Sequence, residues 1–389
     1  MAPVKRAAAR LGCLDKEGIV NKDRPPTRQP VNGAANQSKW GVQLRLIRSM
    51  LACAFAVAPS VAAMAQQPVH VIIATVPTIA STSTYIADAK GYLREAGIDA
   101  EIQKIDSVST AMPLLASGRV QVAQGGFSAG YWNGLAQGMP VIMAFEGGSS
   151  PLNHHVLLSA AMKDKIKTIA DLKGHTVALN APGSIIGYDL YKVLGSAGMT
   201  FKDVEIKYIG FPQMGIALQN GAVDAAVNVP PFGDLVLEKG LGVNWIDTDA
   251  YLKPSPVSVV HYVINTDWAK QNSDLAHRLF LAMARGTRDY CQAYHHGPNR
   301  AEVIGIMIKY GVAGDHESLD KFPWQARDPN GRFNMASVLD VQDWYFNDGL
   351  IKQKFTSEQL VDTSYADEAA KKLGAFEVAN KDSKLGGCR

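Results

Sequence analysis

Hydroxyl-bearing side chains are concentrated in one loop near the start of an alternating strand and helix pattern. Residues 77–84 include Ser81, Thr82 and Ser83 and follow the strand-like run 69–75. A hydroxyl group both donates and accepts hydrogen bonds, so these three side chains could bind a polar ligand. Capping of the next helix accounts equally well for any single one of them. The cluster as a whole favours contact with a ligand.

A second candidate loop combines glycines with aromatic residues. Residues 125–132 follow the third predicted strand and read Gly-Gly-Phe-Ser-Ala-Gly-Tyr-Trp. Glycine allows the backbone to approach a ligand closely, and an aromatic ring can cover one face of it. Trp132 is better explained by packing of a helix on its sheet. We therefore expect Phe127 and Ser128 to contact the ligand.

A third loop, residues 180–188, leads from a strand into a helix and supplies Asn180, Gly183, Ser184 and Tyr188. Free backbone N–H groups and the positive end of the helix dipole at such a turn attract an anion or a carbonyl oxygen. An ordinary strand-to-helix turn has the same sequence pattern. Opposite the hydroxyl-rich loop, however, this segment would complete a binding cleft.

The remaining candidates are Phe211, Pro231, Phe232 and one of two adjacent histidines. Neighbouring side chains in extended chain point to opposite sides, so at most one of His154 and His155 should face the ligand, and we select His154. The candidate loops contain no Lys or Arg, which disfavours nitrate or a sulfonate. Aromatic, hydroxyl and amide groups suit a planar or partly apolar organic solute. The sequence has no Cys-x-x-Cys motif or Cys/His cluster, so we expect no metal site, no cofactor and no catalytic residue.

Two similar segments of the sequence indicate how these loops are positioned. Residues 115–123 and 218–226 each read as the end of an amphipathic helix, a glycine (Gly118 or Gly221) and a short strand. The spacing is far longer than that of a solenoid repeat, so two similar α/β lobes are predicted. In such sheets ligands bind beyond the carboxyl ends of the strands.

The order of predicted elements sets the lobe boundaries. We assign residues 66–153 and 262–389 to lobe one and residues 154–261 to lobe two, joined by two hinge crossings. Segments 147–151 and 254–256, rich in Gly, Ser and Pro, mark the crossings. The segments beyond residue 266 are helical and are expected to cover lobe one. In lobe one the predicted strands are 69–75, 100–105 and 120–124, and the predicted helices are 84–96, 110–117 and 131–137.

Residues 1–65 have the features of an export leader. Arg45 and Arg48 precede an apolar run, and Ala63-Met64-Ala65 is a small-x-small cleavage site, so we expect cleavage after Ala65. This segment holds ten of the 39 Lys and Arg and three of the 36 Asp and Glu, which leaves 29 basic and 33 acidic residues downstream. A mildly acidic body argues against a nucleic-acid partner. Export would permit a disulfide between Cys291 and Cys388, but the sequence does not establish that the two are close.

The ordered set of motifs resembles the substrate-binding proteins of bacterial ABC importers, in the branch of nitrate, sulfonate, taurine and thiamine-pyrimidine-precursor (NMT1/THI5-like) binders. The likeness extends over about residues 69–310. One departure is Gln121, where the family commonly has an Asp; the second segment, residues 218–226, has this Asp as Asp224. We expect this position to brace structure. The segments that carry the likeness are residues 87–93 with 96–97, 115–123, 138–141, 169–174 and 218–226 with 230–231.

This resemblance implies an α/β, two-lobed periplasmic binding protein fold of type II, with the C-terminal helices on lobe one. It also implies a monomeric periplasmic receptor that closes on a small solute and delivers it to a permease with its ATPase. The alternative is an NMT1/THI5-like enzyme of pyrimidine or cofactor metabolism on the same fold. The sequence lacks the cysteine-rich motif of that enzyme type and the Gly-x-Ser-x-Gly elbow of serine hydrolases, so we expect a receptor.

Overall fold

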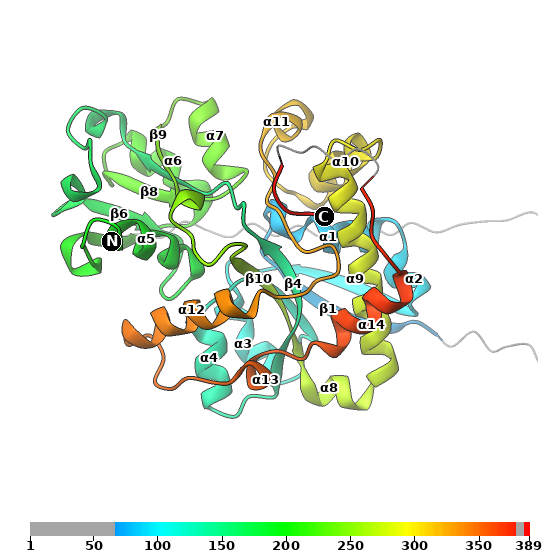
Figure 1. Ribbon diagram of the computed structural model, residues 1–389. Coiled ribbons are helices and arrows are strands. Elements are labelled where there is room, and N and C mark those ends of the chain that lie inside the picture. Colours follow the sequence, from blue (N-terminus) through cyan, green and yellow to red (C-terminus); the bar gives the residue numbers. More distant parts are fainter. Residues whose placement is uncertain (1–66, 379–384) are drawn as a thin grey trace, which may run out of the picture. The chain divides into compact units, whose positions relative to one another are not determined.

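The computed structural model describes residues 67–378 and 385–389 (Figure 1). The expected leader, with its cleavage site after Ala65, lies outside these residues. The described chain is a mixed α/β structure with two five-stranded sheets. One apolar cluster packs against a face of both sheets, and a further cluster covers the other face of each. None of its helices is long and apolar enough to span a membrane.

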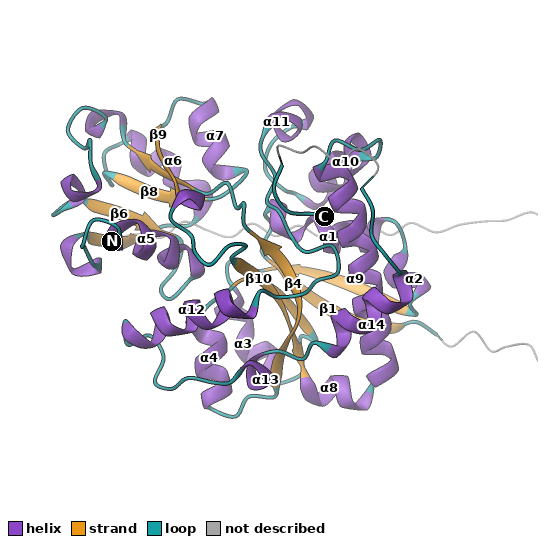
Figure 2. Ribbon diagram, in the orientation of Figure 1, coloured by secondary structure: helices purple, strands orange, loops and turns teal. Residues whose placement is uncertain are grey.

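The first sheet has the strand order β2-β1-β3-β10-β4. β1 pairs in parallel with β2 and β3, whereas β10 is antiparallel to both β3 and β4. Val71 and Ile73 pack in one apolar cluster and Ala74 in another, because successive side chains of a strand point to opposite faces. Helices therefore cover both faces (Figure 2). The strands are β1 (Val69–Thr75), β2 (Ile98–Lys104), β3 (Val122–Gly126), β4 (Val141–Ser149) and β10 (Ser258–Asn265).

The second sheet has the order β7-β6-β8-β5-β9, with β6 parallel to β7 and β8 and β5 antiparallel to β8 and β9. Leu157 and Ala178 face one cluster, whereas Val156 and Val177 face the other. The two sheets therefore alternate in the same way and share one topology. The strands are β5 (His155–Leu158), β6 (Thr176–Leu179), β7 (Glu205–Tyr208), β8 (Ala225–Asn228) and β9 (Val243–Asp247).

The two similar segments, residues 115–123 and 218–226, occupy equivalent places in the two sheets. Gly118 (φ +70°) and Gly221 (φ +69°) both adopt the left-handed conformation that ends a helix. The Ile72 amide donates to Gln121 Oε1 at 2.8 Å, and the Thr176 amide donates to Asp224 Oδ2 at 3.0 Å. Both side chains brace a neighbouring strand, as expected.

Helices connect the strands and fill the C-terminal part of the chain. The long helix α9 packs on α1 and α14 at the first sheet (Figure 1). α12 differs from the expectation, because it contacts β10 of the first sheet and also α5 of the second. The α-helices are α1 (Thr82–Ala89), α2 (Tyr92–Glu95), α3 (Val108–Ala116), α4 (Ala129–Ala136), α5 (Ile185–Gly195), α6 (Phe211–Gln219), α7 (Phe232–Glu238), α8 (Thr266–Gln271), α9 (Ser273–Tyr294), α10 (Arg300–Tyr310), α11 (His316–Lys321), α12 (Met335–Asn347), α13 (Ser357–Leu360) and α14 (Ser364–Leu373).

Short 3₁₀ helices complete the fold, and one disulfide links its C-terminal end to α9. Cys291 and Cys388 are bonded, with their Cα atoms 5.1 Å apart, which is within the usual range for disulfides. This bond settles the pairing that the sequence left open. The 3₁₀ helices are η1 (Ile79–Ser81), η2 (Ala160–Met162), η3 (Ile169–Leu172), η4 (Phe201–Asp203) and η5 (Thr248–Ala250).

Candidate binding site

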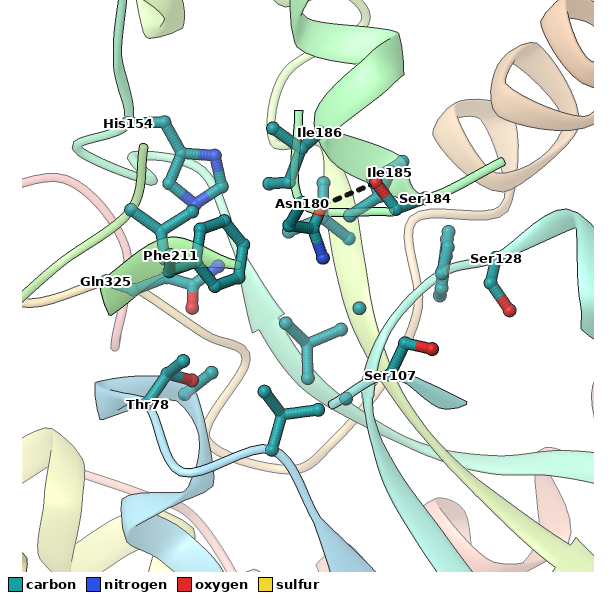
Figure 3. A pocket seen from close by; sticks show the side chains of 18 of the residues that line it. Thr78, Ser107, Ser128, His154, Asn180, Ser184, Ile185, Ile186, Phe211 and Gln325 are labelled. Carbon is teal, nitrogen blue, oxygen red and sulfur yellow. Dashed lines mark hydrogen bonds between the residues drawn. The ribbon is translucent and has the colours of Figure 1, made fainter. Parts of the chain in front are cut away.

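A pocket lies where strands of both sheets end (Figure 3). Residues that follow β1, β2, β3, β6, β7 and β8 line it at the carboxyl ends of these strands. β5 and β10 are antiparallel to their neighbours and so present their amino ends, through His154 and Val259. The lining residues are Val76, Thr78, Ile79, Ala80, Asp106, Ser107, Gly125, Gly126, Phe127, Ser128, His154, Asn180, Ser184, Ile185, Ile186, Phe211, Val229, Pro230, Val259, Val260 and Gln325.

The pocket is small and mostly apolar. Its cavity volume is about 70 Å³, several times the roughly 10–15 Å³ that one water molecule requires by the same measure. Aliphatic side chains and the Phe211 ring form much of the wall, and none of the described residues that line it is Lys or Arg. The space accommodates a small solute with an apolar body and a few polar atoms.

The loop after β3 forms one wall. A Cβ atom at Gly126 would lie 2.8 Å from Ile185 Cγ2, so only glycine allows this approach between the loops that follow β3 and β6. Phe127 is fully buried and packs edge-on against Trp132, with ring centroids 5.8 Å apart. Ser128 Oγ is also buried and has no hydrogen-bond partner among the described residues. Its hydroxyl therefore remains able to bond a ligand.

The loop after β6 forms the facing wall and is bonded directly to the first. Ser184 Oγ donates to Asn180 Oδ1 at 2.6 Å. The Ala129 amide donates to the Gly183 carbonyl, and the Ile185 amide donates to the Phe127 carbonyl, both at 2.9 Å. The Ile185 N–H at the start of α5, expected to attract a ligand oxygen, is therefore used to join the two walls.

His154 and Asp189 form a buried pair beside the pocket. His154 lines it, and its Nδ1 lies 2.7 Å from Asp189 Oδ2, on α5. Removal from water raises the pKa of the fully buried Asp189 carboxyl, an effect that the charge of His154 opposes. His155 is absent from the pocket wall and lies 4.0 Å from Asp234. Only His154 therefore faces the pocket.

The hydroxyl-rich loop contributes less than its composition suggested. Ser81 Oγ lies 2.6 Å from both the Val76 carbonyl and Gln124 Oε1, and Arg327 donates to Ser83 Oγ at 2.6 Å. These hydroxyls, with that of Thr82, are buried within the fold. The lining of the pocket does not include Ser81, Thr82, Ser83, Gly183, Tyr188, Pro231 or Phe232, whereas it includes Phe127, Ser128, His154, Asn180, Ser184 and Phe211.

Several of these side chains have other partners next to the pocket. Tyr188 donates a hydrogen bond to Asp340 on α12. Phe232 stacks behind Phe211, with ring centroids 6.1 Å apart and planes inclined by 14°. Pro230, and not the neighbouring Pro231, lines the pocket. Tyr188, Phe232 and Pro231 therefore support the residues that line the pocket.

Two kinds of lining residue were missed in the sequence. Ser107 follows the second predicted strand, so the carboxyl-end rule could have identified it. Gln325 comes from the long connection between α11 and α12 and carries no local signal. Its Nε2 atom is buried and has no partner among the described residues. Nor does the described chain contain a group of three or more His, Cys, Asp or Glu placed to hold a metal ion.

Comparisons with known proteins point to one family. The family model described as NMT1/THI5 like matches residues 78–294. The formylaminopyrimidine-binding protein of Halalkalibacterium halodurans is 22% identical over 313 residues, covering 75% of this chain and 91% of that protein. The aliphatic sulphonate-binding protein SsuA of Escherichia coli superposes with a TM-score of 0.59 at 20% identity, covering 76% of this chain and 92% of that one. The nitrate-binding protein NrtA of Synechocystis PCC 6803 gives 0.62 at 17%, covering 78% and 89%.

The likeness to these solved structures is one of fold, the α/β fold of periplasmic binding proteins, as expected from the sequence. The desulfurization enzyme DszB has this fold as well, with a TM-score of 0.55 at 13% identity over 78% of this chain and 99% of that one. Because one fold serves both binding proteins and an enzyme, the activity must be argued from the site.

Proposed function

The chain belongs to the NMT1/THI5-like family, and from this premise we propose that it is the solute-binding receptor of an ABC importer. It binds a small organic solute between its two lobes and presents the closed form to a permease with its ATPase. Lobe one is residues 66–153 with 262–389 and lobe two is residues 154–261, except that residues 258–261 pair within the first sheet as part of β10. The receptor acts as a monomer in the periplasm, after cleavage of the leader at Ala65.

The observation that carries this proposal is the composition of the pocket wall from both sheets. Phe127 and Ser128 come from the first sheet, and Asn180 and Ser184 come from the second. A solute held there contacts both lobes at once and stabilises the arrangement in which they meet. Differential binding to the closed form is what a receptor of this kind requires.

The lining also indicates the class of solute. Aliphatic groups and the ring of Phe211 surround a few amide and hydroxyl groups, and the described part of the wall contains no Lys or Arg. Such a wall favours a planar or partly apolar organic solute over nitrate or a simple sulfonate, whose charge calls for cationic donors. The formylaminopyrimidine of the named relative has this planar character.

The proposal is tested with protein released from the periplasm of cells that express the full chain. Native mass spectrometry identifies any co-purified solute, and thermal shift then screens pyrimidines, aromatic acids, alkanesulfonates and nitrate. A solute at a hundredfold excess over its Kd should add about 2.7 kcal/mol to the stability of the folded state. Absence of both a bound solute and a thermal shift contradicts the proposal.

The same experiment separates a receptor from the enzyme alternative. After incubation with each stabilising solute, mass spectrometry should recover that solute unchanged. Conversion of a pyrimidine to a new product would show an enzyme and overturn the receptor assignment. A protein found only in the cytoplasm would overturn the proposed location.

A further inference from the structure

The pair of His154 and Asp189 is the most buried ionisable group at the pocket. The side chain of Asp189 is fully buried, and that of His154 is 6% exposed. Asp189 Oδ1 has no hydrogen-bond partner among the described residues, so the carboxylate relies on His154 alone. An isolated buried carboxylate is strongly unfavourable, and burial raises the pKa of Asp189, so the carboxyl keeps a proton that it can donate to His154 Nδ1.

Protonation determines what His154 offers to the pocket. When the buried Asp189 carboxyl donates its proton to Nδ1, the imidazole carries its own N–H on Nε2. That atom has no hydrogen-bond partner among the described residues, and Asp189 itself does not line the pocket. His154 is therefore placed to donate, and Asp189 is placed to orient it.

Other polar atoms of the wall are donors too. Asn180 Oδ1 accepts from Ser184, which leaves the Asn180 Nδ2 group for the pocket, and Gln325 Nε2 is buried without a partner. Figure 3 shows His154 and Gln325 at the left of the view and Asn180 near its centre. Donors from three separate segments thus surround one space.

We propose that His154, held by Asp189, donates from Nε2 to an sp² oxygen of the solute, a carbonyl or a carboxylate, with Asp189 as a positioning residue. The inference rests on the proposed binding function and specifies the chemistry of the bound group. The proposal agrees with the apolar wall, because a solute that is apolar apart from one oxygen-bearing group suits both the wall and the hydrogen-bond donors.

The charged and titratable groups around this pair come from several elements. Asp249, on η5, accepts from the amides of Leu152 and Asn153 and acts electrostatically on Asp189. His155 is the sequence neighbour, and Asp106 lines the pocket. Tyr345, on α12, is buried, and the charge of Asp189 acts on it. Asp189 makes the direct 2.7 Å contact with the imidazole and is the partner expected to set its tautomer.

The first measurement uses the protein without any solute. Nitrogen-15 NMR of histidine-labelled protein should show His154 with its N–H on Nε2 and with Nδ1 as a hydrogen-bond acceptor. Asp189→Leu should remove this preference and populate both tautomers, whereas His155→Gln should leave the His154 signals unchanged. An N–H on Nδ1 with a bare Nε2 in the unaltered protein overturns the inference, even if the variant fails to fold and whatever the solute panel shows.

The second measurement uses acetate, acetamide and ethylamine, which are small enough for the cavity. Acetate and acetamide should shift the His154 Nε2 signal, and ethylamine should not. A response to acetate alone assigns a carboxylate, and a response to both admits a carbonyl. Asp189→Leu, which no longer fixes the N–H on Nε2, should weaken acetate binding about tenfold or more. A shift with ethylamine, or with none of the three, contradicts the inference.

Discussion

The Ile185 amide donates a hydrogen bond of 2.9 Å to the Phe127 carbonyl and so joins the loop after β6 to the loop after β3. A second bond of the same length runs from the Ala129 amide to the Gly183 carbonyl. The two walls of the pocket are thus held together by main-chain atoms. Opening of the pocket at this side requires both bonds to break, and solvent or a solute must replace them.

Replacement of Gly183 should weaken this junction. Gly183 has φ +63°, and an added Cβ would lie 3.0 Å from Ala129 Cβ, next to the main-chain bond. Gly221 has φ +69° with open space around it. Each change to Ala should lower stability by about 1 kcal/mol through backbone strain. Only Gly183→Ala should also reduce solute affinity, as measured by calorimetry. Equal affinities for the two variants would contradict a role for the junction.

Asp340 on α12 should link the second sheet to the C-terminal helices. It accepts from Tyr188 and lies 2.7 Å from Lys192 Nζ, both on α5. Asp340→Asn should reduce unfolding stability by about 1 kcal/mol in urea, since the carboxylate is partly exposed and screened. Asp343 on the same helix pairs with Lys354 at the surface, so Asp343→Asn should change stability by less than about 0.5 kcal/mol. Matching values for the two would count against this link.

Phe211 should contribute directly to solute binding. Its ring lines the pocket, whereas the Phe232 ring stacks behind it. Phe211→Ala should lower affinity at least tenfold, because about 1.5–3 kcal/mol accompanies complete burial of a large apolar side chain. Phe232→Ala should have a smaller effect on affinity at a comparable cost in stability. Calorimetric titration of both variants decides the point, and a larger loss at Phe232 would reverse the assignment.

The disulfide should stabilise the chain strongly. Cys291 and Cys388 are 97 residues apart, and closure of a loop of this length is typically worth about 2–5 kcal/mol. A Cys291→Ser, Cys388→Ser double variant should lose stability in this range in urea. Dithiothreitol should destabilise the original protein similarly and leave the double variant unaffected. A variant as stable as the original would refute this prediction.

Glu146 should make stability depend on pH. Burial, with the nearby Asp328 charge, raises its pKa to about 8, from an ordinary value of 4.5. The folded state therefore keeps a proton that the unfolded state loses between these two values, so stability falls as pH rises through this window, by up to about 1.4 kcal/mol per unit. Glu146→Gln should flatten the unfolding profile between pH 5 and 8, whereas the exposed Glu205→Gln should preserve it. A profile unchanged by Glu146→Gln would argue against a buried, protonated carboxyl.

The alternation of strands and helices could be predicted because apolar periodicity is a local property. The predicted helix over residues 84–96 nevertheless divides into α1 and α2, since Gly91 adopts φ +77° between them. α12 was expected to cover the sheet of the first lobe, and it also contacts the second. Its Trp344 packs close to Gly187 on α5, an approach that depends on the absence of a side chain far away in the sequence.

The candidate site was predictable where it followed directly from strand ends. Phe127, Asn180 and Phe211 line the pocket because each lies just beyond a strand. The hydroxyl of Ser83 is instead used by Arg327, 244 residues away, and Gln325 enters from the same distant segment. Such contacts arise from tertiary packing, and no local pattern announces them.

Gln121 and Asp224 each brace a strand in one half of the chain, and this equivalence affects how the two halves are compared. One residue is a neutral amide and the other an acid, yet each offers an oxygen to the amide of an adjacent strand, Ile72 in one half and Thr176 in the other. The position requires a hydrogen-bond acceptor that reaches the neighbouring strand, and the charge of that acceptor is not needed. An alignment scored by residue identity therefore underestimates the similarity of the two halves. At this position their hydrogen-bond geometry is the same although the residue types differ.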